Sequence, residues 1–266
     1  MITDKNGCTH DDTGRYSAQN KPHGPLVFDD QTSHDFGEGE VPAHRHLNGG
    51  GWVADTAFVA AEAIIMDNAQ VLNQARVCGT SVISGDAMVD SGAVISGFAK
   101  VVQRAFVSGS VDVHGHALIG GKAQVLDRAV VSGHARVLDM AIVSGEARIS
   151  DAASVLNNAI ATGSASVTGN ATLLDSATVS GSASVQGSAI IQHSASIADA
   201  ASIDGNAIVS DEANVGEMAS VGGYARVGGM VDVGSNVAIT DNVCIVGSGR
   251  LAKANTVIGG DVLLDL

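Results

Sequence analysis

A six-residue repeat runs through most of the chain and limits its possible folds more than any other feature. Cut from residue 50 to residue 265, the sequence gives 36 hexads without insertion or deletion, such as RAVVSG and HARVLD. The fourth place is Val, Ile or Leu in 35 of them, Ala161 being the exception, and the second place is Ala in 27. Two apolar places separated by one residue are typical of a short strand, and apolar residues spaced two and four apart do not keep to one helix face. Each hexad is therefore predicted to be one strand and one turn.

The turns predict how many hexads make one coil. The last place of each hexad often carries Gly, Asp or Asn, which tolerate positive φ. Sorted into three columns of 18-residue spacing, these places include Gly at nine of twelve positions in the column that begins at residue 61, and at four in each other column. This period predicts a triangular prism of about 12 coils of 18 residues. Stacked Ala and Val fill such a narrow core, in keeping with 3% aromatic residues.

A change of composition near residue 50 separates two regions. All three prolines and five of the nine histidines lie before it. We expect residues 1–49 to form an irregular N-terminal capping segment and residues 50–266 to form the hexapeptide-repeat β-helix. Within the cap, Leu26–Phe28 is expected to add a strand or a plug over Trp52, so that no bare sheet edge remains.

One place in the repeat breaks the rule. Ala161 stands where every other hexad has a larger aliphatic residue, beside the outward Ile160. We predict a local irregularity there, either a small void or a strand slip that turns Ile160 inward.

Charge and cysteine content exclude several classes of function. The chain has 28 Asp and Glu against 14 Lys and Arg, a formal net charge of −14. Such a charge disfavours phosphate backbones and anionic lipids, so we expect neither direct nucleic-acid binding nor membrane association. The sequence shows no apolar run that predicts a signal peptide or a membrane span. Three widely separated cysteines indicate reduced thiols, and a cytoplasmic location is expected.

The hexads also resemble those of a known family. AVVSGH and ARVLDM are similar to the repeats of hexapeptide-repeat proteins, which form left-handed parallel β-helices. The segment GGGWVADTAFVAAEAIIMDNAQVLNQARVCG looks like the start of bacterial and phage members that are often labelled acyltransferases. The resemblance implies an all-β, left-handed parallel β-helix. It leaves function open, because the family spans acyltransferases, nucleotidyltransferase tails, metal-dependent carbonic anhydrases and members with no known activity.

Three histidines are the candidates for catalysis. His116 and His134 are 18 residues apart and are predicted to stack on adjacent coils, with His114 around the same corner. The resemblance implies a histidine general base and a long loop that helps to enclose the acyl donor. The uninterrupted hexads lack that loop, which counts against an enzyme. Half of a zinc site shared between subunits is a second possibility, and solvated corner residues without chemistry are the interpretation we favour.

The N-terminal segment holds the candidate metal ligands His34, His44 and His46. An H-x-H on an extended strand points both imidazoles one way, which is half of a metal site. A capping role is favoured, because ligand spacing without supporting contacts is weak evidence for a metal. We therefore expect no cofactor.

One column of outward places is largely apolar. It contains Trp52, Met88, Phe106, Ile142 and Ile160. A line of apolar side chains on a flat surface usually marks a contact, so the column predicts a homo-oligomer, and the family resemblance favours a trimer. The alternative is a set of scattered surface hydrophobes.

Taken together, these patterns favour a non-catalytic binding or scaffold protein that forms a homo-oligomer and offers flat faces to a protein partner. Two alternatives stay open. One is a hexapeptide-repeat acyltransferase with His116 or His134 as general base at a subunit interface. The other is an acidic inhibitor that imitates nucleic acid in the basic groove of a partner.

Overall fold

The computed structural model of the chain describes residues 2–3, 9–10 and 32–266, and these residues form strands and turns without any helix. The chain divides into two compact units, residues 1–133 and 134–266. In the described residues no helix is long and apolar enough to span a membrane. Near the N-terminus, β1 (Ile2–Thr3) pairs antiparallel with β2 (Thr9–His10).

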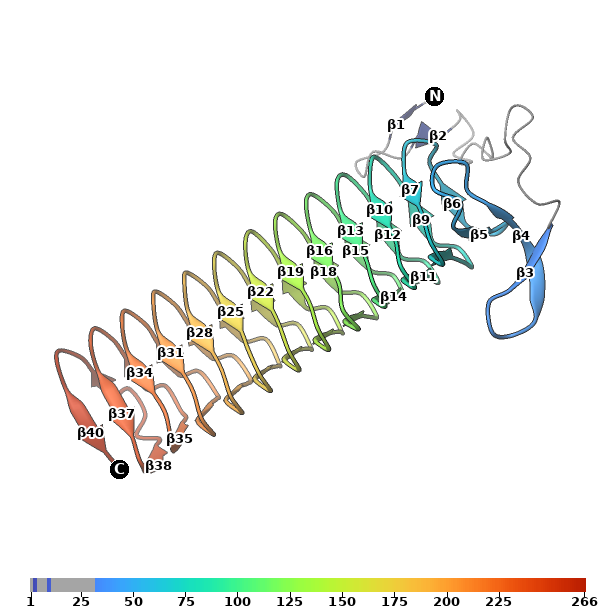
Figure 1. The fold of residues 1–266 in the computed structure, drawn as a ribbon. Helices are drawn as coiled ribbons and strands as arrows, with labels where there is room; N and C mark the ends of the chain where they lie inside the picture. The colour runs from blue at the N-terminus through green and yellow to red at the C-terminus, as the bar shows by residue number, and fades with distance from the viewer. Residues whose placement is uncertain (1, 4–8, 11–31) are drawn as a thin grey trace. The chain divides into compact units, whose positions relative to one another are not determined.

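The first unit contains three sheets of stacked strands, one for each side of a coil (Figure 1). Strands 18 residues apart pair parallel and in register, as Val82 does with Lys100. One sheet holds β7 (Ile64–Ile65), β10 (Val82–Ile83), β13 (Lys100–Val101) and β16 (Leu118–Ile119). A second holds β3 (Ser33–Asp35), β4 (Glu40–Arg45), β5 (Trp52–Ala54), β8 (Gln70–Val71), β11 (Met88–Asp90), β14 (Phe106–Ser108) and β17 (Gln124–Val125). The third holds β6 (Phe58–Val59), β9 (Arg76–Val77), β12 (Val94–Ile95), β15 (Asp112–Val113) and β18 (Val130–Val131).

The second unit repeats this three-sided arrangement. One sheet holds β19 (Arg136–Val137), β22 (Ser154–Val155), β25 (Thr172–Leu173), β28 (Ile190–Ile191), β31 (Ile208–Val209), β34 (Arg226–Val227), β37 (Cys244–Val246) and β40 (Leu263–Asp265). A second holds β20 (Ile142–Val143), β23 (Ile160–Ala161), β26 (Thr178–Val179), β29 (Ser196–Ile197), β32 (Asn214–Val215), β35 (Met230–Val233) and β38 (Ser248–Leu251). The third holds β21 (Arg148–Ile149), β24 (Ser166–Val167), β27 (Ser184–Val185), β30 (Ser202–Ile203), β33 (Ser220–Val221), β36 (Ala238–Ile239) and β39 (Val257–Ile258).

The core lies inside the coils, where the repeat places it. Ala165 and Val167 are fully buried, and Ser166 between them faces outward. Because this alternation recurs from coil to coil, each unit has a core of stacked Ala, Val and Ile. The predicted all-β fold of about twelve coils of about 18 residues is confirmed. The left hand of the coil, which the family resemblance implies, stays a prediction.

Most of the corner residues have positive φ, as the repeat predicts. Gly97 has φ 70° and Asp67 has φ 59°. A Cβ on Gly97 would lie 3.1 Å from the backbone nitrogen of Gly115 on the next coil, a tight approach that favours glycine at this corner. At another corner a short acidic side chain links two coils: Asp67 Oδ2 accepts a hydrogen bond of 3.0 Å from the backbone N–H of Gly85.

The predicted strand slip at Ala161 is wrong. Strand β23 pairs in register with β20 and β26, and Ile160 stays on the outer face. The amide of Ser144 donates to the carbonyl of Ala161, and the amide of Thr162 donates to that of Val179, both at 2.9 Å. The register holds because these backbone bonds between coils do not depend on the size of the inward side chain.

Ala161→Val is expected to stabilise the protein by about 1 kcal/mol, because it adds methyl groups at a place where the in-register neighbours Val143 and Val179 already carry them. Denaturant unfolding would measure the change. The control is Ala159→Val, at an inward place whose neighbours Ala141 and Ala177 are also small, and there overpacking should lower stability. Equal losses in both variants would show that Ala161 has no spare space.

The six-residue register is wrong in the last two hexads. Ala238 pairs with Val257, 19 residues later, and β37 pairs with β40 at the same offset. Ile258 and Leu264 therefore replace the predicted Val257 and Leu263 at the inward places. Val257 and Leu263 are 73% and 71% exposed. One extra residue in the turn after β38 accounts for the shift, because it moves every following side chain to the opposite face.

The expectation of reduced thiols is wrong for Cys78, which is disulfide-bonded. Cys244 has a free thiol. Because disulfides persist mainly in oxidising compartments, the cysteines no longer support a cytoplasmic location, which stays a prediction.

Candidate binding site

A hairpin extends the second sheet of the first unit beyond its first coil. Strand β3 pairs antiparallel with β4, and β4 pairs antiparallel with β5. The hairpin turn contains Gly37 and Gly39, whose φ values are 111° and 108°. Asp35 Oδ1 accepts hydrogen bonds from the amides of Gly37 and Gly39 at 2.8 and 2.9 Å, and these bonds hold the pKa of the Asp35 carboxyl below its ordinary value. The hairpin covers the edge of β5, a role the sequence assigns to the N-terminal segment.

Trp52 connects this hairpin to the first coil. The His34 ring stacks on the Trp52 ring with centroids 4.1 Å apart, and Arg45 Cζ lies 4.1 Å from the Trp52 centroid. Arg45 Nη1 also donates to the carbonyl of Gly50 at 2.8 Å. The sequence predicts Trp52 at a subunit contact, but only 5% of the residue is exposed within a single chain. The predicted plug, Leu26–Phe28, lies outside the described residues.

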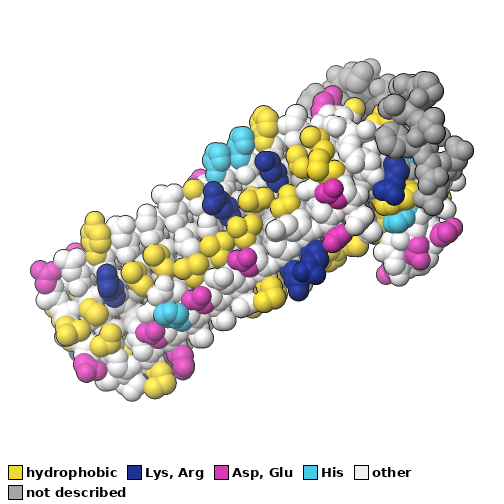
Figure 2. All heavy atoms as spheres, viewed as in Figure 1, with side chains coloured by type: hydrophobic (Ala, Val, Ile, Leu, Met, Phe, Trp, Pro, Cys, Tyr) yellow, Lys and Arg dark blue, Asp and Glu magenta, His cyan; other side chains and the backbone are white. Residues whose placement is uncertain are grey.

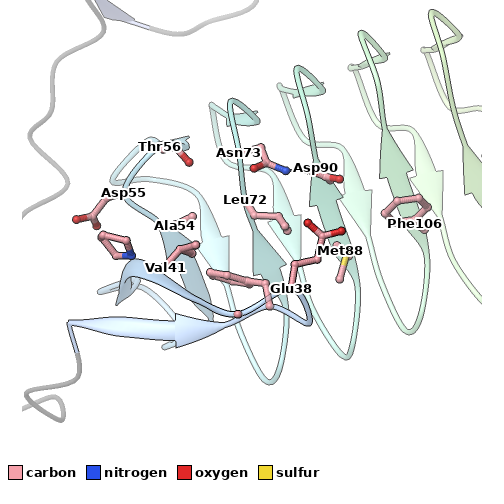
Figure 3. Close-up of a pocket in the computed structure, with 13 residues that line it drawn as sticks. Glu38, Val41, Ala54, Asp55, Thr56, Leu72, Asn73, Met88, Asp90 and Phe106 are labelled. Carbon is pink, nitrogen blue, oxygen red and sulfur yellow. Dashed lines mark hydrogen bonds between the residues drawn. The ribbon is translucent and has the colours of Figure 1, made fainter.

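A cavity of about 540 Å³ lies between the hairpin and the outer face of the coils (Figure 3). Its size falls within the range of small-molecule pockets, about 300–1,000 Å³. Apolar side chains come from both sides of the cleft. The complete lining is Phe36, Glu38, Gly39, Val41, Pro42, Ala54, Asp55, Thr56, Leu72, Asn73, Met88, Asp90 and Phe106.

The cleft is negatively charged. Its lining includes Glu38, Asp55 and Asp90 but no Lys or Arg. Asn73 Nδ2 and a backbone amide donate to Asp90 Oδ1, and His44 Nδ1 lies 2.9 Å from Asp55 Oδ1. In Figure 3 the Glu38 side chain reaches from the hairpin toward the coils. The site therefore combines an apolar floor with carboxylates that water can reach.

The three candidate metal ligands each have a partner within the chain. His34 packs on the indole described above, and His44 pairs with Asp55. His46 is 4% exposed, and its Nδ1 lies 3.3 Å from the backbone oxygen and nitrogen of Asn48. In the described part of the chain no three His, Cys, Asp or Glu residues are grouped to hold a metal ion. The metal site stays a prediction.

Acidification is expected to weaken the hairpin region through His46. Burial lowers the pKa of His46 from its ordinary value of 6.5. At pH values between the folded and the unfolded pKa the unfolded chain binds more protons, so stability is complete above pH 6.5 and falls as the pH drops below that value. Thermal unfolding between about pH 8 and about pH 5 would measure this loss. His46→Gln should reduce the decrease in melting temperature with falling pH. His193→Gln, an exposed control in the second unit, should leave that decrease as it is in the wild type. If the melting temperature of His46→Gln depended on pH as strongly as that of the wild type, His46 would not be the group that causes the loss.

The candidate catalytic histidines do not line the cleft. His114 Nδ1 lies 3.2 Å from Asp112 Oδ1, and the His116 ring stacks on the exposed Phe98 with centroids 4.8 Å apart. His116 belongs to the first unit and His134 to the second, so their predicted stacking stays a prediction.

The predicted apolar column has two environments. Met88 and Phe106 are neighbours in register on β11 and β14, and both line the cleft. In the second unit, Ile142 and Ile160 are neighbours in register on β20 and β23, and both are half-exposed on the outer face.

Sequence reasoning missed the other side of the cleft. Phe36 and Val41 belong to a segment without the six-residue period, so the repeat gives no information on where they lie. On the coil side, sequence reasoning also missed Leu72 and Asp90, which occupy the fifth place of their hexads, between the buried fourth place and the turn residue. Leu stands at the fifth place of other hexads as well, as at Leu126, which does not line the cleft, so the repeat carries no signal that singles out Leu72.

Neither a protein-family model nor a curated protein matches the chain. The resemblance to hexapeptide-repeat proteins therefore rests on the hexads, and the fold supports its coarser part, a β-solenoid of parallel strands.

Proposed function

We propose that the chain is a non-catalytic binding protein whose β-solenoid holds a ligand under the β3–β4 hairpin. The observation that carries the proposal is the cavity of about 540 Å³, which has apolar side chains on both of its sides. An open cleft of this kind exposes apolar surface to water at a cost in free energy, which a bound ligand would remove. Binding is favoured over catalysis because the lining contains no His, Cys, Ser or Lys, and its one hydroxyl, that of Thr56, has no hydrogen bond to a base within the described part of the chain.

Nile red, a neutral hydrophobic fluorophore, is expected to bind the cleft and gain fluorescence. Met88→Ser should weaken its binding about tenfold, because the variant removes an apolar contact worth about 1.5 kcal/mol. Val94→Ser is the matched control, since Val94 has the same place in the next hexad but lies on another side of the coil. No gain in fluorescence, or equal weakening by both variants, would contradict the proposal.

No feature of the cleft supports the acyltransferase alternative in the way that the apolar cavity supports binding. A cleft with Glu38, Asp55 and Asp90 in its lining would repel the phosphates of an acyl-CoA donor. Neither His116 nor His134 lines the cleft.

The acidic-inhibitor alternative also gains no support. Asp151, Asp199 and Asp211 lie in three different corner columns of the second unit, each bonded to the residue 18 positions later. Acidic side chains are scattered over the face shown in Figure 2 and do not form one patch. An imitation of nucleic acid needs charge concentrated on one surface.

We further propose that the protein is a homo-oligomer, a trimer by family resemblance, through the outer face that carries Ile142 and Ile160. These half-exposed side chains are stacked in register, and a subunit contact would remove them from water. Sedimentation would test this, with Ile142→Ser/Ile160→Ser expected to yield monomers. The control is Ile190→Ser/Ile208→Ser, an equivalent in-register pair on another sheet. A wild-type monomer would overturn the proposal. A separate protein partner stays a prediction.

A further inference from the structure

We infer that the ligand of the cleft is a small amphipathic cation, an ammonium group joined to an apolar tail or ring. This inference rests on the proposed function and adds the chemical class of the ligand. Two properties of the cleft carry it, its charge and its apolar floor.

Two of the three carboxylates in the cleft, Glu38 and Asp90, have no cationic partner within the described part of the chain, whereas Asp55 pairs with His44 Nδ1 at 2.9 Å. No Lys or Arg lines the cleft, and Glu38 has no hydrogen bond or ion pair within the described part of the chain. Asp90 is held in place by Asn73 and a backbone amide, both of which donate to it. Such a carboxylate is oriented without losing its negative charge. The net charge of −14 adds a long-range attraction for cations and a barrier to anions.

The floor of the cleft selects for an apolar group on the same molecule. Leu72, Met88 and Phe106 come from three successive coils (Figure 3), and Phe36 and Val41 of the hairpin complete the apolar lining. Phenylalanine rings attract cations through their negative faces, and the thioether of Met88 adapts its shape to different apolar groups. A hydrated inorganic cation would leave this surface exposed to water, whereas an ammonium compound with an apolar tail would satisfy both parts of the site.

The volume favours a small molecule over a segment of a protein. About 540 Å³ is the size of a site for a compact organic ligand. The cleft is also bounded by the hairpin turn on one side and by the coils on the other (Figure 3).

Three probes with the same tail would test the charge preference on the full-length protein: octyltrimethylammonium, octanol and octanoate. Calorimetric titration should give a dissociation constant for the cation about tenfold lower than that for the alcohol, with octanoate the weakest. Added salt should reduce the advantage of the cation, because the carboxylates are in contact with water.

Glu38→Gln/Asp90→Asn should bring the cation's affinity close to that of octanol and leave the affinity for octanol itself unchanged. Glu212→Gln removes an exposed carboxylate of the second unit, and it should change neither the affinity for the cation nor that for octanol. Equal binding of cation and alcohol by the wild type, or tighter binding of octanoate, would overturn the inference while Nile red binding still supported the proposed function. Failure of every probe, Nile red included, would overturn both. An unaltered cation preference in Glu38→Gln/Asp90→Asn would also overturn the inference.

Discussion

Trp52→Ala is expected to release the β3–β4 hairpin from the first coil and to abolish binding in the cleft. The indole is 95% buried under His34 and Arg45, and its removal eliminates both contacts at once. Truncation of a buried aromatic residue costs about 3–5 kcal/mol, but a hairpin at the end of a solenoid can detach without unfolding the remaining coils. The loss should therefore appear locally, as rapid proteolysis within residues 33–45 and loss of Nile red fluorescence, with a smaller effect on the main unfolding transition.

Two variants separate this effect from a general loss of stability. Trp52→Phe keeps a ring for His34 and Arg45 to stack on, so it should retain most of the protection from proteolysis. Phe58→Ala removes a ring from the same hexad place on the next side of the coil, and it should leave the hairpin protected. Unaltered proteolysis and probe binding in Trp52→Ala would show that other contacts hold the hairpin.

The fold was predictable because two independent features of the repeat, its apolar places and its turn residues, indicate the same structure. Ala at the second place and an aliphatic residue at the fourth specify which side of each strand is buried, and the turn residues specify where each side ends. Ala161 shows that the backbone register tolerates a missing side chain, since the ladder on both sides of it is regular. Val257 shows the limit of the pattern. Val257 is an aliphatic residue at the fourth place of its hexad, where the repeat predicts burial. One added residue in the preceding turn exposes it instead, and the six-residue period does not indicate where such an added residue lies.

The cleft was predictable only on one side. Met88 and Phe106 belong to an outward apolar column, and such a column requires a cover. The sequence suggests a second subunit as that cover, whereas part of the column lies under the chain's own hairpin. The difference arises because Phe36 and Val41 come from a segment whose position depends on the Trp52 contact and on two antiparallel pairings. Neither interaction leaves a period in the sequence, so the partner of an apolar face cannot be identified from the face alone.

Ile191→Ala is expected to destabilise the second unit by about 2–5 kcal/mol, and Ile190→Ala by less than about 1 kcal/mol. The two residues are adjacent on β28, but Ile191 is fully buried between Leu173 and Val209, whereas Ile190 is half-exposed on the outer face. A cavity at Ile191 affects both neighbouring coils, because each coil of a solenoid is stabilised mainly by those next to it. Denaturant unfolding of both variants would measure the difference. A slip of one residue exchanges the two faces of a strand. If Ile190→Ala lost more unfolding free energy than Ile191→Ala, this coil would have the opposite register, and the period of 18 would not hold there.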